Sequence, residues 1–306
     1  MHKKILIFPL IVFSCVMSFL PQGDSVLAQC VEWQRTYGGS GEDIGSTVPL
    51  TSDGGYIIAC YTDSFSAGRS CIWLIKTDSF GNIQWDSTYC YDTSIGMQQH
   101  LPWVDQTADG GYIVTGASDY LWSESSELVL IKTDSLGDIE CDTTFGGANY
   151  EGGCWVGQTS DRGYIVGGLT FSSFGGGGPH IWIIKTDSSY SIECSLTCAD
   201  NGGRMLQTLD DSYILIGEAG LDGYVSKITS QCSTIWERTF QKYGCESFCD
   251  VDSTSDDGYV LVGGTAINYP PNDKVWLIKI DSLGIKEWDT TYGGMASRQD
   301  AVFVER

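Results

Sequence analysis

The sequence predicts an all-β protein, a β-propeller of four-stranded blades with five full repeats and partial units at its ends. Two repeated patterns carry this prediction, because self-similarity at about 40–50 residues is typical of propellers and repeat arrays. The first is an acidic-glycine turn followed by a tyrosine and an apolar run, with the tyrosines at Tyr56, Tyr112, Tyr164, Tyr213 and Tyr259. The second is an apolar run that ends in a lysine, at Lys76, Lys132, Lys185, Lys227 and Lys279.

The first unit shows how one blade is expected to fold. Ser46–Thr51 alternates weakly and leads into a turn, 52–55, whose Asp-Gly pair accepts the positive φ angles of a tight hairpin. Tyr56–Tyr61, Ile72–Thr77 and Asn82–Tyr89 then form the second, third and fourth strands, joined by a variable loop and a tight Asp-Ser-x-Gly turn. No stretch shows helical periodicity over ten residues, which favours an all-β fold.

The apolar positions of each unit predict its core. The second and third strands are almost continuously apolar, as expected for sheets that are buried on both faces between neighbouring blades. The position three residues before each repeated lysine is bulky: Trp73, Val129, Trp182, Tyr224 and Trp276. The fourth strand carries an aromatic pair, replaced in two units by cysteine-containing pairs: Trp33/Tyr37, Trp85/Tyr89, Cys141/Phe145, Cys194/Cys198, Trp236/Phe240 and Trp288/Tyr292.

The chain divides into a predicted signal peptide and one propeller. Residues 1–28 combine Lys3 and Lys4 with an apolar run that is short for a membrane span and a small-residue cleavage site. The propeller then covers residues 29–306. Its repeats are predicted at about 38–89, 90–145, 146–198, 199–240 and 241–292, with a partial unit at 293–306.

The ends of the propeller do not form a whole blade. Cys30–Tyr37 reads as a fourth strand before the first full unit, and Gln299–Arg306 reads as the first strand of a sixth unit. We therefore expect a fragment of a longer propeller with six or more blades. The alternative is a five-bladed ring with two stray strands.

Charge and apolar content limit the partners. The chain has a net charge of −22, which repels nucleic acid and anionic membranes. No stretch after the signal is long and apolar enough to span a membrane. We expect a secreted or cell-surface protein.

The cysteines predict disulfides in an exported protein. There are twelve, and Cys15 lies in the signal, so an odd number remains. The closest plausible pair is Cys60 with Cys71, at the two ends of one hairpin loop. The CxxxC spacings place their cysteines too far apart along a strand for a shared tetrahedral site. No metal site and no cofactor are expected.

The lysine that ends each third strand stands two residues before an aspartate in four units, as in Lys76 and Asp78. The two side chains would then lie on one face of the strand. A symmetric feature of this kind is expected to be scaffold, so we predict an ion pair within the blade or a lid on the hydrophobic layer; the fourth unit breaks the pattern, with Thr229 in place of the aspartate. A ring of lysines that binds an anion is the alternative.

The DGGY hairpin, the LIKTDSxGxxxW hairpin and the WxxTYGG segment resemble the repeats of exported bacterial β-propeller proteins, many of which carry a type IX secretion sorting domain. The resemblance covers about residues 30–306 and implies a surface or secreted scaffold. A weaker similarity links Asp78, Gly81 and Trp85 to the repeats of quinoprotein dehydrogenases, with one residue fewer between Asp and Gly.

The predicted ligand-binding face is the one that carries the long, divergent loops. Alternate connections of a meander lie on opposite faces, so the tight turns gather on one side and the long loops on the other. Loops on a rigid scaffold concentrate binding residues, and aromatic anchors suit carbohydrate or protein surfaces. The candidate ligand-binding residues are Tyr120, Trp122, Phe171, Phe174, His180 and Tyr269. The alternative is that these side chains cap the blade edges.

These features predict a non-catalytic binding or adhesion scaffold for a glycan or a cell-surface protein. No catalytic residue can be nominated, because the two histidines after the signal lie in no recognisable nucleophile context and the acids are too many to single out a pair. The alternative is an enzyme, either a polysaccharide-active hydrolase or a quinone-dependent dehydrogenase. A spacer for another domain is a third possibility.

Overall fold

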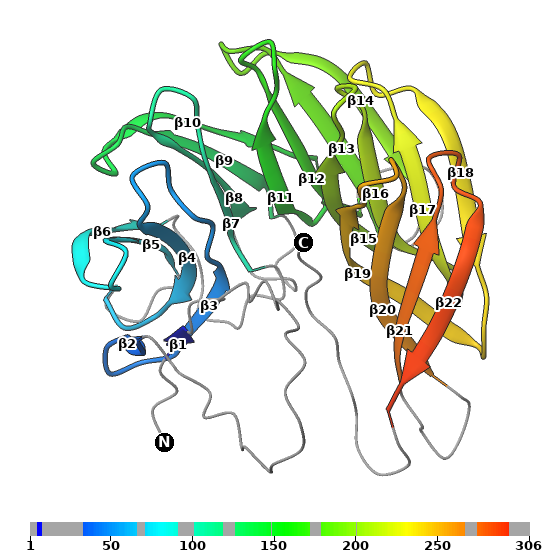
Figure 1. Ribbon diagram of the computed structural model, residues 1–306. Coiled ribbons are helices and arrows are strands. Elements are labelled where there is room, and N and C mark those ends of the chain that lie inside the picture. The colour runs from blue at the N-terminus through cyan, green and yellow to red at the C-terminus, as the bar shows by residue number, and fades with distance from the viewer. Residues whose placement is uncertain are drawn as a thin grey trace, which may run out of the picture.

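The computed structural model describes residues 5–7, 33–65, 71–90, 101–118, 126–147, 149–171, 179–199, 201–266 and 274–293, which contain strands and turns but no helix. The strands form five four-stranded antiparallel sheets and one two-stranded sheet. The four-stranded sheets follow one another in chain order around an arc (Figure 1). The predicted architecture of four-stranded propeller blades is confirmed.

Each blade is a meander whose strands are paired in chain order. The first blade contains β3 (Asp43–Thr47), β4 (Tyr56–Thr62), β5 (Cys71–Thr77) and β6 (Ile83–Cys90). The second contains β7 (Trp103–Gln106), β8 (Tyr112–Ala117), β9 (Leu128–Thr133) and β10 (Ile139–Phe145). The third contains β11 (Glu151–Gln158), β12 (Tyr164–Thr170), β13 (His180–Thr186) and β14 (Ile192–Cys198).

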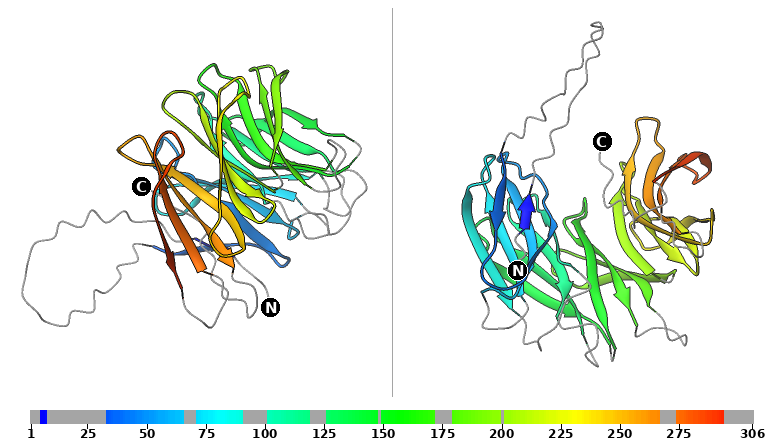
Figure 2. Two further views of the ribbon diagram at one scale, coloured as in Figure 1. Left: turned by 90° about the vertical axis from the view of Figure 1, so that its right-hand side faces the viewer. Right: turned by 90° about the horizontal axis from the view of Figure 1, so that it is seen from below.

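The remaining two blades have the same plan. The fourth contains β15 (Asn201–Gln207), β16 (Tyr213–Ala219), β17 (Asp222–Ile228) and β18 (Thr234–Phe240). The fifth contains β19 (Cys245–Ser253), β20 (Tyr259–Ala266), β21 (Lys274–Ile280) and β22 (Lys286–Tyr292). First strands face the middle of the arc and fourth strands face its outside, and the first and last blades lie at its two ends (Figures 1 and 2).

The strand boundaries correct some predictions. The first strand of the first blade is Asp43–Thr47 rather than 46–51, and the fourth extends one residue further than predicted, to Cys90. The predicted N-terminal fourth strand is observed as β2 (Arg35–Tyr37). It pairs with β1 (Ile5–Ile7), a segment inside the predicted signal peptide. The predicted strand 299–306 lies outside the described residues.

The core lies between the blades, as the continuous apolar runs predict. Between the first two blades, Ile72 and Leu74 of β5 pack with Val104 of β7 and Ile131 of β9, and all four are buried. Burying one such side chain is worth about 1.5–3 kcal/mol. Each blade is therefore stable only with a neighbour, which explains why apolar residues occupy both faces of its middle strands.

The repeated lysines form ion pairs within their blades, as predicted, but with a different aspartate. Lys76 Nζ contacts the Asp53 carboxylate in the first turn of its blade at 2.8 Å, whereas Asp78 accepts the backbone N–H groups of Phe80 and Asn82. The physical reason is that Asp78 lies beyond the strand end, where its carboxylate closes the tight turn. The same lysine–aspartate pair joins the two turns of every blade: Lys76–Asp53, Lys132–Asp109, Lys185–Asp161, Lys227–Asp210 and Lys279–Asp256.

Neighbouring blades are joined where the fourth strand of one meets the tight turn of the next. The Trp85 indole N–H donates to the carbonyl of Ser135 at 3.1 Å, and the Tyr89 hydroxyl donates to the carbonyl of Gly137 at 2.6 Å. A Cβ on Gly137 would lie 2.7 Å from the Trp85 ring, so only glycine fits beneath this indole. We call this contact the Trp–Gly clasp.

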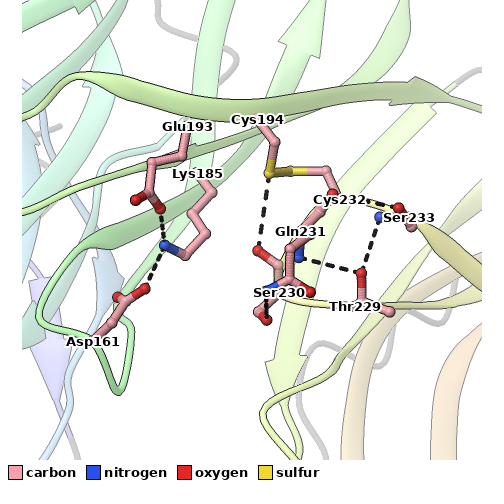
Figure 3. The surroundings of a disulfide bond; sticks show 9 residues. All are labelled: Asp161, Lys185, Glu193, Cys194, Thr229, Ser230, Gln231, Cys232 and Ser233. Atoms are coloured by element: carbon pink, nitrogen blue, oxygen red, sulfur yellow. Dashed lines mark hydrogen bonds and ion pairs between the residues drawn. A yellow bond between two sulfur atoms is a disulfide. The ribbon is translucent and has the colours of Figure 1, made fainter.

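Two blade interfaces replace the clasp with other residues at the same two positions. In the third blade, Tyr190 stands where glycine would, and its own ring stacks on Tyr164 with centroids 5.4 Å apart. The preceding fourth strand offers only the small Cys141 at the tryptophan position. Between the third and fourth blades, Cys194 and Cys232 occupy the two positions and form a disulfide (Figure 3).

The predicted disulfide between Cys60 and Cys71 is wrong. Cys71 bonds to Cys90, which lies directly opposite it on β6 with the Cα atoms 4.5 Å apart. Cys60 lies opposite Trp73, two residues away from the partner position of Cys71, and is a free, buried thiol. Burial raises the pKa of the Cys60 thiol, which makes it a poor nucleophile.

Candidate functional site

The long-loop face begins where the second strand of each blade ends. Of the six predicted ligand-binding residues, Phe171 and His180 lie in the described part of the chain. Tyr120, Trp122, Phe174 and Tyr269 lie outside the described residues. Phe171 follows directly after β12, and His180 is the first residue of β13, opposite Thr170. The structure thus brings these two residues to the same end of the third blade.

Phe171 is part of an aromatic platform at this end. Its ring is 39% exposed and meets the buried ring of Tyr150 edge to face, with centroids 5.8 Å apart. The first blade also presents an exposed ring, at a different position, that the sequence reasoning missed: Phe65, 50% exposed, lies 4.8 Å from the buried ring of Trp73 on β5. Two blades therefore present an exposed ring supported by a buried one.

In these two blades, as in the fifth, a buried acid on the first strand accepts a hydrogen bond from a threonine on the second strand. Glu151 Oε1 accepts a hydrogen bond from the Thr170 hydroxyl at 2.9 Å, and Asp43 Oδ1 accepts one from Thr62 at 2.5 Å. In both blades the acid precedes its threonine by 19 residues, and the same carboxylate also accepts a backbone N–H from the loop that enters the blade. An acid 19 residues before a threonine is therefore the sequence signal by which this pair can be found.

His180 has a structural contact that the prediction did not foresee. Its ring is partly buried, and Nδ1 lies 3.0 Å from the carbonyl oxygen of Ala199. Ala199 has a positive φ of 48°, and this contact satisfies its carbonyl at the end of β14. One nitrogen of the predicted ligand-binding histidine is therefore used within the blade.

A second candidate region is an open groove of about 580 Å³ on the turn face, between the first three blades. Its lining is mainly polar and includes Ser52, Asp105, Gln106, Asp109 and Gln158. Each glutamine side-chain oxygen accepts a backbone N–H from the turn of the preceding blade at 2.8 Å, which fixes the walls.

The pKa values of two carboxyl groups in this groove are shifted in opposite directions. Burial raises the pKa of Asp105 to about 6, and the backbone N–H of Gln106 only partly opposes this. Burial also acts on Asp109, but hydrogen bonds from Thr107, the backbone of Gly111 and Lys132 outweigh it and hold its pKa at about 2. Two acids with pKa values pushed apart can divide the roles of proton donor and anion.

The axis of the arc carries a charged contact between three blades. The guanidinium of Arg204 on β15 lies over the ring of Trp103 on β7, 4.6 Å from its centroid. Arg204 Nε is 3.0 Å from Asp250 Oδ1 on β19, and Nη1 donates to the carbonyl of Cys249 at 3.3 Å. The guanidinium thus contacts the face of the Trp103 ring and the Asp250 carboxylate, and these contacts link the second, fourth and fifth blades.

The described residues contain no group of three or more His, Cys, Asp or Glu side chains placed to hold a metal ion. Asp250, which belongs to an acidic stretch, is instead paired with Arg204. Within the same described ranges, no helix is long and apolar enough to cross a membrane.

Comparison with known proteins gives similarity at the level of solved structures. No protein-family model matches the sequence, and no curated protein matches it. The chain aligns with a eukaryotic initiation factor at 9% identity, covering 81% of this chain and 55% of that one, with a TM-score of 0.43. A provisionally assigned gluconolactonase aligns at 9% identity over 80% of each chain, with a TM-score of 0.43.

An acylaminoacyl peptidase from Pyrococcus horikoshii aligns at 8% identity, covering 80% of this chain and 38% of that one, with a TM-score of 0.45. The chain spans about half the length of the initiation factor and less of the peptidase. At such low identities and TM-scores these likenesses carry no function to this chain.

Proposed function

We propose that this protein is an exported, non-catalytic β-propeller that binds a glycan or a cell-surface protein through its long-loop face. The observation behind this proposal is the aromatic platform that recurs in two blades, with Phe65 and Phe171 each exposed over a buried ring. An exposed ring on a rigid support loses little conformational freedom when a ligand covers it. Sugar rings and apolar protein side chains both pack on such a surface.

Charge and disulfides support the rest of the proposal. The net charge of −22 disfavours polyanionic partners, so a neutral glycan or a basic protein surface fits best. The two disulfides, Cys71–Cys90 and Cys194–Cys232, are of the kind that persists in oxidising compartments. Both features agree with the secretory signal predicted at residues 1–28.

The test is a double substitution on the platform, Phe65→Ala with Phe171→Ala. We expect binding to an array of immobilised glycans and cell-surface proteins to fall at least tenfold, with little change in the midpoint of thermal unfolding. The matched control is Phe80→Ala, because Phe80 is a similarly exposed phenylalanine (59%) on the opposite, turn face. Equal loss in the control, or undiminished binding in the double variant, would refute a role for the platform.

The polar groove favours a second function, hydrolysis of a polysaccharide. Here Asp105 is the candidate proton donor, because a carboxyl with a pKa of about 6 keeps part of its proton near neutral pH. Asp109, with a pKa of about 2, is ionised in the same groove. Glycosidases use two carboxyl groups in these different states.

Turnover of a polysaccharide panel by the purified protein tests this second candidate. Asp105→Asn should abolish any hydrolysis, whereas Asp252→Asn, a change at the equivalent position of β19, should leave it intact. Absence of turnover in the unaltered protein, or equal effects of both substitutions, would count against the groove as an active site.

A further inference from the structure

The outer face of the last blade carries the residues of a blade interface, but no further blade packs against it within the part of the chain that the structure describes. Trp288 and Tyr292 on β22 occupy the positions of Trp85 and Tyr89 on β6. They are 47% and 58% exposed, whereas Tyr89 is 6% exposed. Large exposed rings at positions that are buried in other repeats mark an interaction surface.

The other blades show what these two side chains bind. The first clasp repeats the geometry of the second: the Trp33 indole donates to the Ser79 carbonyl at 2.9 Å, and the Tyr37 hydroxyl donates to the Gly81 carbonyl at 2.7 Å. Trp236 donates in the same way to the Ser282 carbonyl at 3.2 Å. In each case the acceptor is the tight turn between the third and fourth strands of the next blade.

The tryptophan also selects the residue that it covers. Under Trp33, Trp85 and Trp236, the turn has a glycine, and a Cβ there would lie 2.6–2.9 Å from the indole. The two turns that carry a side chain at this position follow a cysteine instead: Tyr190 after Cys141, and Cys232 after Cys194. The residue on the fourth strand therefore specifies the turn residue of its partner, and Trp288 specifies glycine.

We propose that Trp288 and Tyr292 form a docking surface for one further blade of this repeat type. Its third-to-fourth turn would offer two carbonyl acceptors, to the indole N–H of Trp288 and the hydroxyl of Tyr292. Its turn glycine, with a positive φ, would lie beneath the Trp288 ring. The occupant is a β-hairpin with a D-S-x-G turn, and the surface excludes a turn with a side chain at the last position.

A second copy of this chain does not supply such a turn. The turns of the first, second and fifth blades are already covered by Trp33, Trp85 and Trp236. The turn of the third blade is filled by Tyr190, and that of the fourth is held by the Cys194–Cys232 disulfide. All five turns of a copy are therefore occupied.

The probe is a synthetic hairpin with the sequence of residues 128–145, which contains the D-S-L-G turn at 134–137. Its open end is closed by a D-Pro-Gly link and Cys141→Ser removes its thiol, so that it is folded before it meets the protein. We expect it to bind the full chain in calorimetry. Gly137→Val in the hairpin, or Trp288→Ala with Tyr292→Ala in the protein, should weaken binding at least tenfold. Absence of binding by the folded hairpin, or binding that ignores these changes, overturns the proposal.

Disulfide trapping locates the bound hairpin, because cysteines at these two positions already bond naturally in Cys194–Cys232. Trp288→Cys in the protein and Gly137→Cys in the hairpin should cross-link at least tenfold faster than a control with Trp288→Ala and Glu287→Cys, which removes the same ring and places the thiol on the other face of β22. Equal rates contradict the docking geometry. Sedimentation tests the other occupant: dimers of the unmodified chain that Trp288→Ala with Tyr292→Ala dissociates would assign the surface to a second copy and overturn the proposal.

Discussion

The turn face and the axis of the propeller differ in how their ion pairs are solvated. On the turn face, the buried Lys132 meets Asp109 and Glu140, whose side chains are more than half exposed to water. At the axis, Arg204 and Asp250 are both largely buried, with side chains 22% and 8% exposed. The turn-face pair recurs in every blade, whereas the axial position varies and is Thr47, Trp103, Trp155, Arg204 and Asp250 in turn. Repeated positions therefore build the scaffold, and the axis is where the blades acquire individual roles.

The largest expected effect comes from breaking the axial pair. Arg204→Met leaves the Asp250 carboxylate buried without its cation and should lower the free energy of unfolding by about 4 kcal/mol. Lys132→Met on the turn face should cost only about 1 kcal/mol, because its acidic partners remain in water. Urea denaturation of both variants measures the difference. Adding Asp250→Asn to Arg204→Met should recover part of the loss, and a failure to do so would contradict an uncompensated charge.

The disulfide between the third and fourth blades gives the next effect. Replacing both Cys194 and Cys232 with alanine should lower stability by about 3 kcal/mol, since the bond closes a long loop in the unfolded chain. Urea denaturation measures it, with the unaltered oxidised protein as the comparison, so that the Cys71–Cys90 disulfide is present in both. A variant as stable as the oxidised parent would show that this interface needs no covalent replacement for the Trp–Gly clasp.

A comparison of two glycines distinguishes the contribution of the Trp–Gly clasp to stability from the cost of a left-handed backbone. Gly137 and Gly110 have nearly equal φ angles of 84° and 85°, but only Gly137 has an indole within reach of an added Cβ. Gly110→Ala should therefore cost about 1 kcal/mol from the left-handed backbone alone. Gly137→Ala should cost about 2 kcal/mol more, because Trp85 must move. Thermal unfolding of the two variants gives the comparison, and equal losses would argue against the clasp.

The last comparison is the pH dependence of stability after substitution of two acids at equivalent positions, Asp105 in the second blade and Asp252 in the fifth. The pKa of Asp105 is raised to about 6 in the folded protein, above the unfolded value of about 3.9. Its ionisation therefore reduces stability as the pH rises from about 4 to 6. Asp105→Asn should raise stability at pH 7.5 by up to about 3 kcal/mol, the full value of a shift of about two pKa units, and leave it nearly unchanged at pH 4. Asp252→Asn is the control, and a gain of equal size there would contradict a special environment for Asp105.

The local pattern of the sequence was sufficient to predict the four strands of each blade. Short continuous apolar runs, Asp-Gly turns and the repeated lysines predicted four strands per unit, because each is a short-range preference of backbone and burial. The aromatic positions Trp73, Tyr89 and Trp276 were correctly placed in the core for the same reason. The boundary errors at β3 and β6 are a few residues and follow from the weak patterning of edge strands.

Pairing across blades could not be predicted in the same way. The disulfide prediction with Cys60 failed because it depends on the register of neighbouring strands, and the predicted β6 stopped one residue before Cys90. The Trp–Gly clasp was readable only by comparing each fourth strand with the next turn, as in Cys141 and Tyr190. Of the predicted site residues, Phe171 is exposed at a platform and His180 is held by a backbone carbonyl.

The sequence by itself determined the repeat, its four strands and the acidic character of the surface, since these depend on residues close together in the chain and on composition. Only the tertiary structure decided which cysteines bond, which carboxylate meets each lysine and where Arg204 reaches. Those outcomes depend on the distance and water access between residues that are 17 (Lys227 and Asp210) to 101 (Arg204 and Trp103) positions apart in the chain. Stacking the blades sets both, because it brings the side chains of one sheet against the turns of the next.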